Sequence, residues 1–420
     1  ILSLLMLIPS AIIQDLIKER ETRSDETILK INEKWSNSQM LVGPVLTIPY
    51  TYTYEDEKKV NVTENHTLNI FPETLKFNVK LFPEERHYGI YKSILYKSNI
   101  SMTGKFPKID FSKINFTTIK WDEATIRIGI SDLRGITNNI DFVLNNQHYT
   151  AEAGGNKQDV MGRGLIISPK NMELFQSGKN LDFNCKLNLN GSSNMNFIPV
   201  GKTTQVDING AWKSPGFIGS FSPEHSIDKN GFSAKWNILY FNRPIPETWL
   251  DENIDTLQDS SFGVSLVDTV DHYQQNMRSA KYALMFIVLT FVVFFFVEVI
   301  TKKRIHPVQY LLVGIALILF YSLLLSISEQ LNFAWAYLIA SIATLSLISI
   351  YAHSIFKNKM QTALLLGFLS LLYTFLYVIL QLEDIALLIG SIGLFVILAV
   401  IMFVSKKINW YKPEEEIKNE

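Results

Sequence analysis

The chain has 420 residues, a net charge of −1, 47% apolar residues and only 19% charged residues. Ten charged residues lie between Lys281 and Val404, so the sequence divides into a water-soluble block and an apolar membrane block. This division excludes a wholly soluble enzyme, a disordered chain, a coiled coil and a collagen-like fibre, and the lack of a concentrated positive charge argues against a nucleic-acid binder.

An apolar run at residues 1–13 opens the chain and is too short by itself to cross a membrane. A cleaved signal peptide is one interpretation, but no small-residue cleavage site precedes Gln14. Apolar residues recur at helical spacing as far as Trp35, which favours an uncleaved transmembrane anchor at residues 1–17 and a juxtamembrane helix at residues 18–36. Because the chain does not begin with Met, we expect the anchor to be truncated.

Apolar and polar residues alternate in several short runs across residues 37–265, a pattern that is typical of β-strands. Turn-forming pairs such as Gly154-Gly155 and Pro215-Gly216 separate these runs. The clearest runs are residues 74–82, 124–130, 181–191, 202–212 and 231–241. We therefore predict a large inserted all-β domain at residues 37–265, either a sandwich or a barrel-like pair of sheets. The strand order does not follow from the sequence.

Five long apolar runs follow a return helix that we predict at residues 266–280. They lie at residues 281–300, 308–328, 334–355, 361–382 and 385–404. Each has about 20 residues, enough for a helix to cross a hydrocarbon core of about 30 Å. Five such runs in series favour membrane spans over buried helices of a soluble bundle. With the anchor, the sequence predicts six spans, including a five-helix transmembrane bundle at residues 281–404, and a cytoplasmic tail at residues 405–420.

The short loops between the apolar runs alternate in charge, which predicts the orientation of the chain in the membrane. Positive loops carry Lys302-Lys303-Arg304, Lys357 with Lys359, and Lys406-Lys407, whereas residues 328–333 and 383–384 carry no Lys or Arg. Placing the positive loops in the cytoplasm puts the β domain on the extracytoplasmic side of the membrane. Both termini are then cytoplasmic.

Catalytic and cofactor motifs are missing from the sequence. The seven His form no HExxH or HxH pattern, and GxSxG, phosphate-loop and dinucleotide-binding patterns do not occur. Cys185 is the only cysteine, which excludes an intrachain disulfide and any multi-cysteine metal site. We therefore predict no catalytic, cofactor-binding or metal-binding residues.

Polar residues at the ends of the apolar runs are the candidate functional residues, because such groups are costly in a membrane. They are Glu298, His306, Ser326, Glu329, His353, Gln381, Glu383 and Asp384. The plain interpretations are an ion pair of Glu298 with nearby basic residues and a helix cap at His306-Pro307. Residues 326–329 and 381–384 would form a polar and acidic outer rim. The mid-bilayer acid–base pair that is typical of a proton-coupled transporter is not evident.

Four segments resemble the CreD family of bacterial inner-membrane proteins, also called cell envelope integrity proteins. They are IQDLIKERETRSDETILKINEKW at 13–35 leading into GPVLTIPY at 43–50, and residues 197–238, 262–299 and 306–340. Together they cover most of the chain in the family's order. The resemblance implies an inner-membrane location and a role in envelope integrity and in the response to envelope stress and antibiotics. It implies no catalytic residues.

Three functional hypotheses remain open. The first is a non-enzymatic membrane protein whose β domain binds an envelope component or a protein partner. The second is a transporter or lipid-handling protein with a pocket in the helix bundle. The third is an enzyme that uses dispersed residues such as Glu298, His306, Glu329 and His353. In each case we expect the lipid bilayer as a partner, no cofactor and no nucleic acid, and the sequence leaves the ligand and the oligomeric state open.

Overall fold

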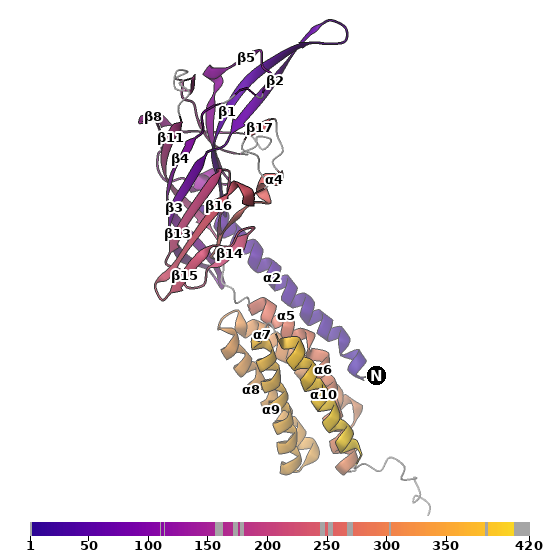
Figure 1. The fold of residues 1–420 in the computed structure, drawn as a ribbon. Coiled ribbons are helices and arrows are strands. Elements are labelled where there is room, and N and C mark those ends of the chain that lie inside the picture. The colour runs from indigo at the N-terminus through magenta and orange to yellow at the C-terminus, as the bar shows by residue number, and fades with distance from the viewer. Residues whose placement is uncertain are drawn as a thin grey trace, which may run out of the picture. The chain divides into compact units, whose positions relative to one another are not determined.

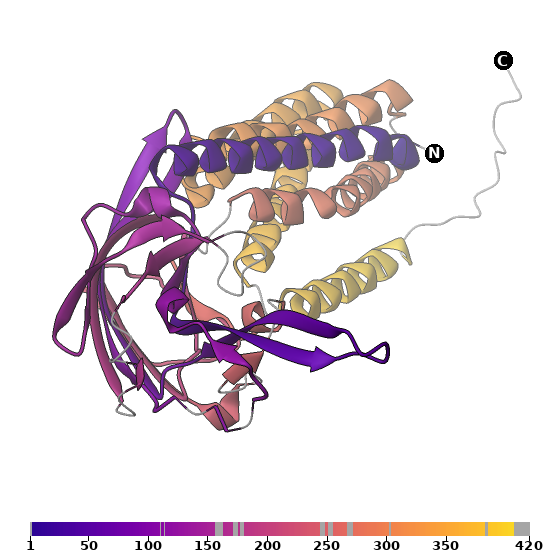
Figure 2. The ribbon, with the colours of Figure 1, turned by 90° about the horizontal axis from the view of Figure 1, so that it is seen from above.

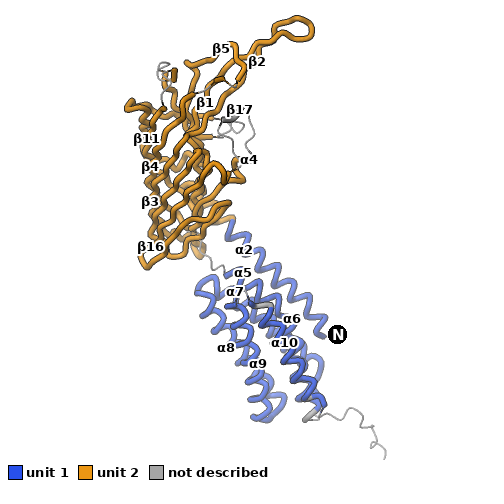
Figure 3. The backbone as a smooth tube through the Cα atoms, in the orientation of Figure 1, with its two compact units in different colours: residues 1–25, 270–420 blue, residues 26–269 orange. Residues whose placement is uncertain are grey.

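The computed structural model divides the chain into two compact units, residues 1–25 with 270–420 and residues 26–269 (Figure 3). It describes residues 2–109, 111–112, 114–155, 163–170, 175–176, 180–243, 248–250, 255–266, 272–301, 304–382 and 385–406. Figure 1 draws both units as ribbons and labels many of their helices and strands.

Residues 26–269 form the predicted large two-sheet β region. The first sheet has the order β14 (Gly216–Gly219), β18 (Phe262–Ser265), β12 (Asn194–Ile198), β1 (Gln39–Glu55), β6 (Thr125–Ile130), β10 (Gly164–Ile167) and β9 (Glu152–Gly154). Strands β2 (Asn61–Ile70) and β5 (Thr118–Ile119) also pair with β1, and β17 (Thr248–Leu250) pairs with β2.

The second sheet has the order β15 (Glu224–Asp228), β16 (Gly231–Leu239), β13 (Thr203–Gly210), β3 (Thr74–Tyr88), β4 (Tyr91–Phe106), β11 (Leu181–Ser192), β7 (Asp141–Leu144) and β8 (Gln147–Thr150). Short helices connect parts of the region: η1 (Trp121–Glu123), η2 (Leu133–Gly135), η3 (Tyr240–Asn242) and α4 (Asp255–Gln258). Most neighbouring strands are antiparallel, but β12 is parallel to β1 and β13 is parallel to β3.

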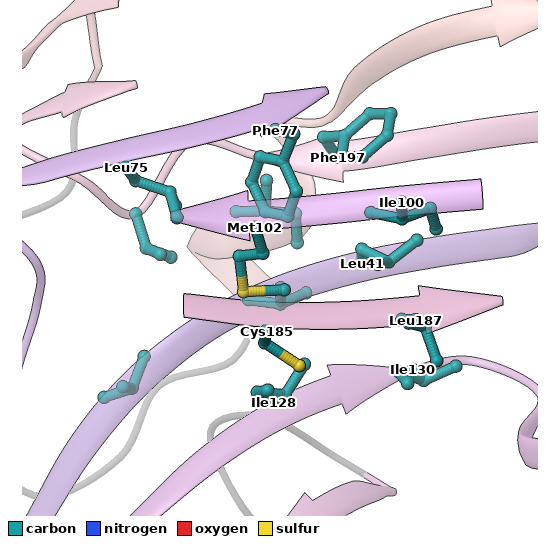
Figure 4. Close-up of a cluster of buried hydrophobic side chains, with 14 of the residues drawn as sticks. Leu41, Leu75, Phe77, Ile100, Met102, Ile128, Ile130, Cys185, Leu187 and Phe197 are labelled. Carbon is teal, nitrogen blue, oxygen red and sulfur yellow. The ribbon is translucent and has the colours of Figure 1, made fainter. Parts of the chain in front are cut away.

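The two sheets share one apolar core, because the alternating strands of the second sheet bury every other side chain. The rings of Phe77 on β3 and Phe197 on β12 lie 5.1 Å apart and join the sheets. Figure 4 shows Leu75, Phe77, Ile100, Met102, Cys185 and Leu187 of the second sheet in the same cluster as Leu41, Ile128, Ile130 and Phe197 of the first. This packing of one sheet on the other positions the exposed elements of the region.

The long helix α2 (Leu7–Trp35) follows the short helix α1 (Leu2–Leu5), and its last ten residues belong to the β region. The Ser93 hydroxyl donates a hydrogen bond of 2.6 Å to the side-chain oxygen of Asn32. The Arg86 guanidinium lies 4.6 Å from the centre of the Trp35 ring, a cation–π contact. The end of α2 is therefore held by side chains of β3 and β4.

The other unit contains α5 (His272–Lys281), α6 (Ala283–Thr301), α7 (Pro307–Ser328), α8 (Phe333–Phe356), α9 (Lys359–Gln381) and α10 (Ala386–Ser405). Among the described residues, α7, α8 and α9 are each long and apolar enough to span a membrane. Helices α5 and α6 make a fourth candidate if the pair, bent by 43°, counts as one span. The apolar part of α10, Leu388–Phe403, is shorter. The structure thus supports three or four candidate spans beside the long N-terminal helix, and the count of six stays a prediction.

Candidate functional site

The predicted candidate residues that the structure describes lie near the ends of α6, α7, α8 and α9. Glu329 caps the C-terminus of α7 and Gln381 ends α9, whereas His306 caps the N-terminus of α7. Ser326 and Gln381 are exposed and make no contact with Glu329 that the structure shows. Glu383 and Asp384 lie outside the described residues, so the predicted acidic rim is described only in part.

Glu329 accepts polar contacts from two other helices. The Tyr273 hydroxyl on α5 donates a hydrogen bond of 3.2 Å to its Oε1 atom. The Arg20 guanidinium on α2 lies 3.9 Å from its Oε2 atom, and the Glu329 side chain is only 10% exposed. A buried carboxylate needs such partners, because an unpaired charge would be costly. The contacts join α2, α5 and α7 around one carboxylate.

Beside Glu329, the inner face of α5 carries a stripe of buried polar side chains. Asn276 donates through Nδ2 to the carbonyl of His272, at 2.7 Å, and to the hydroxyl of Ser328, at 2.8 Å. The Oδ1 atom of Asn276 and the hydroxyl of Ser279 are buried and have no hydrogen-bond partner within the described part of the chain. Sequence reasoning missed this stripe, although polar residues at helical spacing in the return helix were a usable signal.

Glu298 lies on α6, near the N-terminal end of α7, and accepts two hydrogen bonds. The Tyr310 hydroxyl donates to Oε2 at 2.7 Å, and the backbone N–H of Ile305 donates to Oε1 at 3.2 Å. Of the two expected ion-pair partners, Lys302 lies outside the described residues, and Arg304 makes no ion pair with Glu298 in the described structure. Tyr310 was not predicted, and its position one turn into α7 gave no reason to single it out.

His306 and His353 are held by local contacts. His306 caps α7, as predicted, by accepting a hydrogen bond of 3.3 Å from the backbone N–H of Val308. His353 Nδ1 lies 3.4 Å from the hydroxyl of Thr362 and links the end of α8 to the start of α9. The described residues contain no group of three or more His, Cys, Asp or Glu that could hold a metal ion.

A groove between α8 and α9 is a concave feature of the helical unit, with a volume of about 440 Å³. Its lining is mainly apolar and aromatic, with a few hydroxyl groups. The lining residues are Ala334, Trp335, Tyr337, Leu338, Ser341, Ile342 and Leu345 of α8 and Ser370, Tyr373, Thr374 and Tyr377 of α9. Such volume and composition are typical of small-molecule or lipid sites. Sequence reasoning anticipated a pocket as an alternative but named none of its residues.

In the β region, the β1–β2 hairpin runs out beyond the body of the two sheets (Figure 2). One face of this arm carries aromatic side chains, with Tyr52 and Tyr54 stacked at 5.7 Å between ring centres. The Tyr54 hydroxyl donates a hydrogen bond of 2.9 Å to Glu64 on the partner strand, which raises the pKa of Tyr54. His66 stacks on Tyr50 at 5.4 Å. The arm therefore presents ordered aromatic and acidic groups to solvent.

Comparisons with known proteins agree along almost the whole chain. A family model described as "Inner membrane protein CreD" matches residues 1–411. Inner membrane protein CreD of Escherichia coli (strain K12) is 33% identical over 414 residues, which cover 97% of this chain and 91% of that protein. The match includes both the β region and the candidate spans.

Proposed function

This chain belongs to the CreD family of inner membrane proteins, and from that membership we propose that it supports cell envelope integrity and the envelope stress response. In this proposal the β region binds an envelope component or a protein partner. The helices that flank the region in the sequence hold it at the membrane. The protein acts as a scaffold or sensor and not as an enzyme.

One observation carries the proposal: the β1–β2 arm presents an aromatic face whose side chains are already ordered. Isolated two-stranded hairpins are only marginally stable in water, so side-chain contacts across the arm matter for its order. Tyr52 and Tyr54 stack on each other, and Glu64 accepts the Tyr54 hydroxyl. Tyrosines supply large contact area at low entropic cost, which suits recognition of a partner. The arm is thus the part of the β region best suited to binding.

The orientation of the chain is part of the proposal. Six spans would include an anchor at residues 1–17 and the five apolar runs within 281–404, with the tail at 405–420 in the cytoplasm. The positive loops after the second and fourth spans support cytoplasmic termini and a periplasmic β region. A reporter enzyme that works only outside the cytoplasm should be active when it is fused near Thr150. Activity at this position of a reporter that works only in the cytoplasm would refute the orientation.

The binding role can be tested by substitutions on the two faces of the arm. The variant with Tyr52→Ala and Tyr54→Ala should lose complementation of an envelope-stress phenotype in cells that lack the gene. Thr51→Ala with Thr53→Ala is the matched control, because these residues occupy the opposite face of the same strand. We expect the control to complement fully. Equal complementation by both variants, at equal protein level, would refute a role for the aromatic face.

A lipid-handling protein is the second candidate function, and the groove between α8 and α9 is the observation that favours it. We also propose Glu329 as a functional residue of the membrane edge, since among the predicted candidates it is the one that joins three helices. The other predicted residues, Glu298, His306, Ser326, His353, Gln381, Glu383 and Asp384, remain candidates for this edge.

A further inference from the structure

We propose that the groove between α8 and α9 holds one acyl chain of a membrane phospholipid, drawn from the leaflet on the Glu329 side. This inference deepens the lipid-handling function proposed above by naming the chemical class of its ligand. It rests on the depth of the groove, on its surroundings and on contacts that keep it open.

The groove extends over one leaflet. Its lining residues on α8 run from Ala334, one residue after the start of the helix, to Leu345. From Ala334 to Leu345 the helix advances by eleven residues at about 1.5 Å each. The groove therefore extends about 16 Å along the helix axis, roughly half of a hydrocarbon core of about 30 Å. Trp335 marks the shallow end and is 58% exposed, as expected of an aromatic side chain at the membrane interface. Since α7 ends at Ser328, this shallow end lies on the Glu329 side.

The surroundings determine the occupant. Helices α8 and α9 are candidate spans of an inner membrane protein, so lipid chains are the solvent at this depth. An empty groove of about 440 Å³ would forfeit the dispersion contacts of its lining atoms. Leu338 and Ile342 expose about half of their side chains there. Because lipid tails are as apolar as leucine, the chain must be held by shape and close contact and not by the hydrophobic effect.

Contacts behind the groove keep it from collapsing. The Tyr337 hydroxyl on α8 donates a hydrogen bond of 2.7 Å to the backbone carbonyl of Tyr373 on α9. Both rings pack edge-on against Phe320 of α7, with ring centres 5.5 Å and 4.8 Å away. These side chains are buried and fix the spacing of α8 and α9. The groove is therefore preformed, and the acyl chain enters it without rearranging the helices.

Among the residues that the structure describes, only those of α8 and α9 line the groove. Helix α10 contacts α9 through Gly393, which lies against the ring of Phe375. Phe375 is not among the lining residues. A second copy of the chain would fill the groove with protein, and the test below separates that case from a bound lipid.

The test uses the full-length protein in nanodiscs of phosphatidylethanolamine and phosphatidylglycerol. A minor fraction of the phosphatidylethanolamine carries a diazirine on one acyl chain, either near the carboxyl group or at the middle of the chain. After illumination, mass spectrometry locates the labelled residues. We expect the shallow probe to label residues near Trp335 and Tyr377 and the deeper probe to label residues near Leu345 and Ser370.

Substitutions at one depth separate a bound chain from ordinary surrounding lipid. Thr374→Trp fills the groove, whereas Leu371→Trp places the same indole on a lipid-exposed position of α9 outside it. Overfilling a packed site should reduce groove labelling about tenfold in the first variant and leave it unchanged in the second. Ile342→Trp and its control Ile339→Trp repeat the comparison on α8. Equal labelling in all four variants, or crosslinks between two copies through the groove, would overturn the proposal.

The same variants tested for complementation separate this inference from the function on which it rests. A Thr374→Trp variant that loses the label but still complements would support the bound chain and refute a lipid-handling function. Unchanged labelling would refute the bound chain and leave the binding role of the β region intact.

Discussion

Asp132 is the charged group whose removal should have the clearest effect on the β region. Its side chain is only 9% exposed and accepts hydrogen bonds from Arg134 through Nε, at 2.9 Å, and Nη2, at 2.7 Å. The backbone N–H groups of Asn37, at 2.9 Å, and Arg134, at 3.1 Å, also donate to it. Asn37 lies between the end of α2 and the start of β1, so the carboxylate stabilises the connection between this helix and the sheet. We predict that Asp132→Asn loosens that junction.

The magnitude follows from the pKa of the carboxylate. Hydrogen bonds from the Arg134 side chain, assisted by backbone N–H groups and opposed by burial, lower the pKa of Asp132 to about 2. Against an ordinary value of about 3.9, this difference corresponds to at most about 2.5 kcal/mol of stability at pH 7. Arg134 is 54% exposed and the pair is screened by water, so we expect a loss of about 1–2 kcal/mol.

The sign of the pH dependence is fixed, because the folded state lowers the pKa of Asp132. The stabilisation is fully present above about pH 4 and is lost as the pH falls toward 2. The wild-type protein should therefore lose more stability than Asp132→Asn across this interval. The two proteins should become equal near its acid end.

Hydrogen exchange of the full-length protein, read by mass spectrometry over the α2–β1 junction, measures this effect. The amide of Asn37 should exchange about tenfold faster in Asp132→Asn at pH 7, since about 1.4 kcal/mol corresponds to a factor of ten. Urea unfolding of the β region supplies the global free energy. An unchanged exchange rate at pH 7, or a difference between the proteins that persists at pH 2, would refute the reasoning.

Three further predictions concern other parts of the chain. Burial raises the pKa of the Cys185 thiol to about 12, so a maleimide should label this cysteine only after urea unfolds the β region, and labelling in native buffer would contradict the core packing. Tyr273→Phe should lower stability in nanodiscs by about 1 kcal/mol, and should cost nothing in a Glu329→Leu background if their hydrogen bond is responsible. Gly393→Leu should lower the thermal stability of the protein, because the new side chain meets the ring of Phe375 and separates α10 from α9. Adding Phe375→Ala to this variant should restore the stability, and failure of that rescue would show that the two positions are not in contact.

The large β region and several of the C-terminal helices could be predicted from the sequence, because burial leaves a local pattern. Strand β11, Leu181–Ser192, alternates buried and exposed residues along its length, as the run at 181–191 predicted. Helix α7, Pro307–Ser328, matches the apolar run at 308–328. The cap at His306 also follows from neighbouring residues. Strand β1 did not appear as an alternating run, since the side chains on both of its faces are buried from Leu41 to Ile48.

The contacts between distant segments were decided only by the tertiary structure. The parallel pairing of β1 with β12 joins residues 156 positions apart, such as Gln39 and Met195, and no local pattern encodes such a partner. In the spans, both lipid-facing and protein-facing sides are apolar, so periodicity does not reveal which side faces inward. The sequence therefore grouped Ser326 and Ser328 in one outer rim, whereas only Ser328 of the two is buried and accepts a hydrogen bond from Asn276. For the same reason the groove between α8 and α9 exists only once the two helices pack.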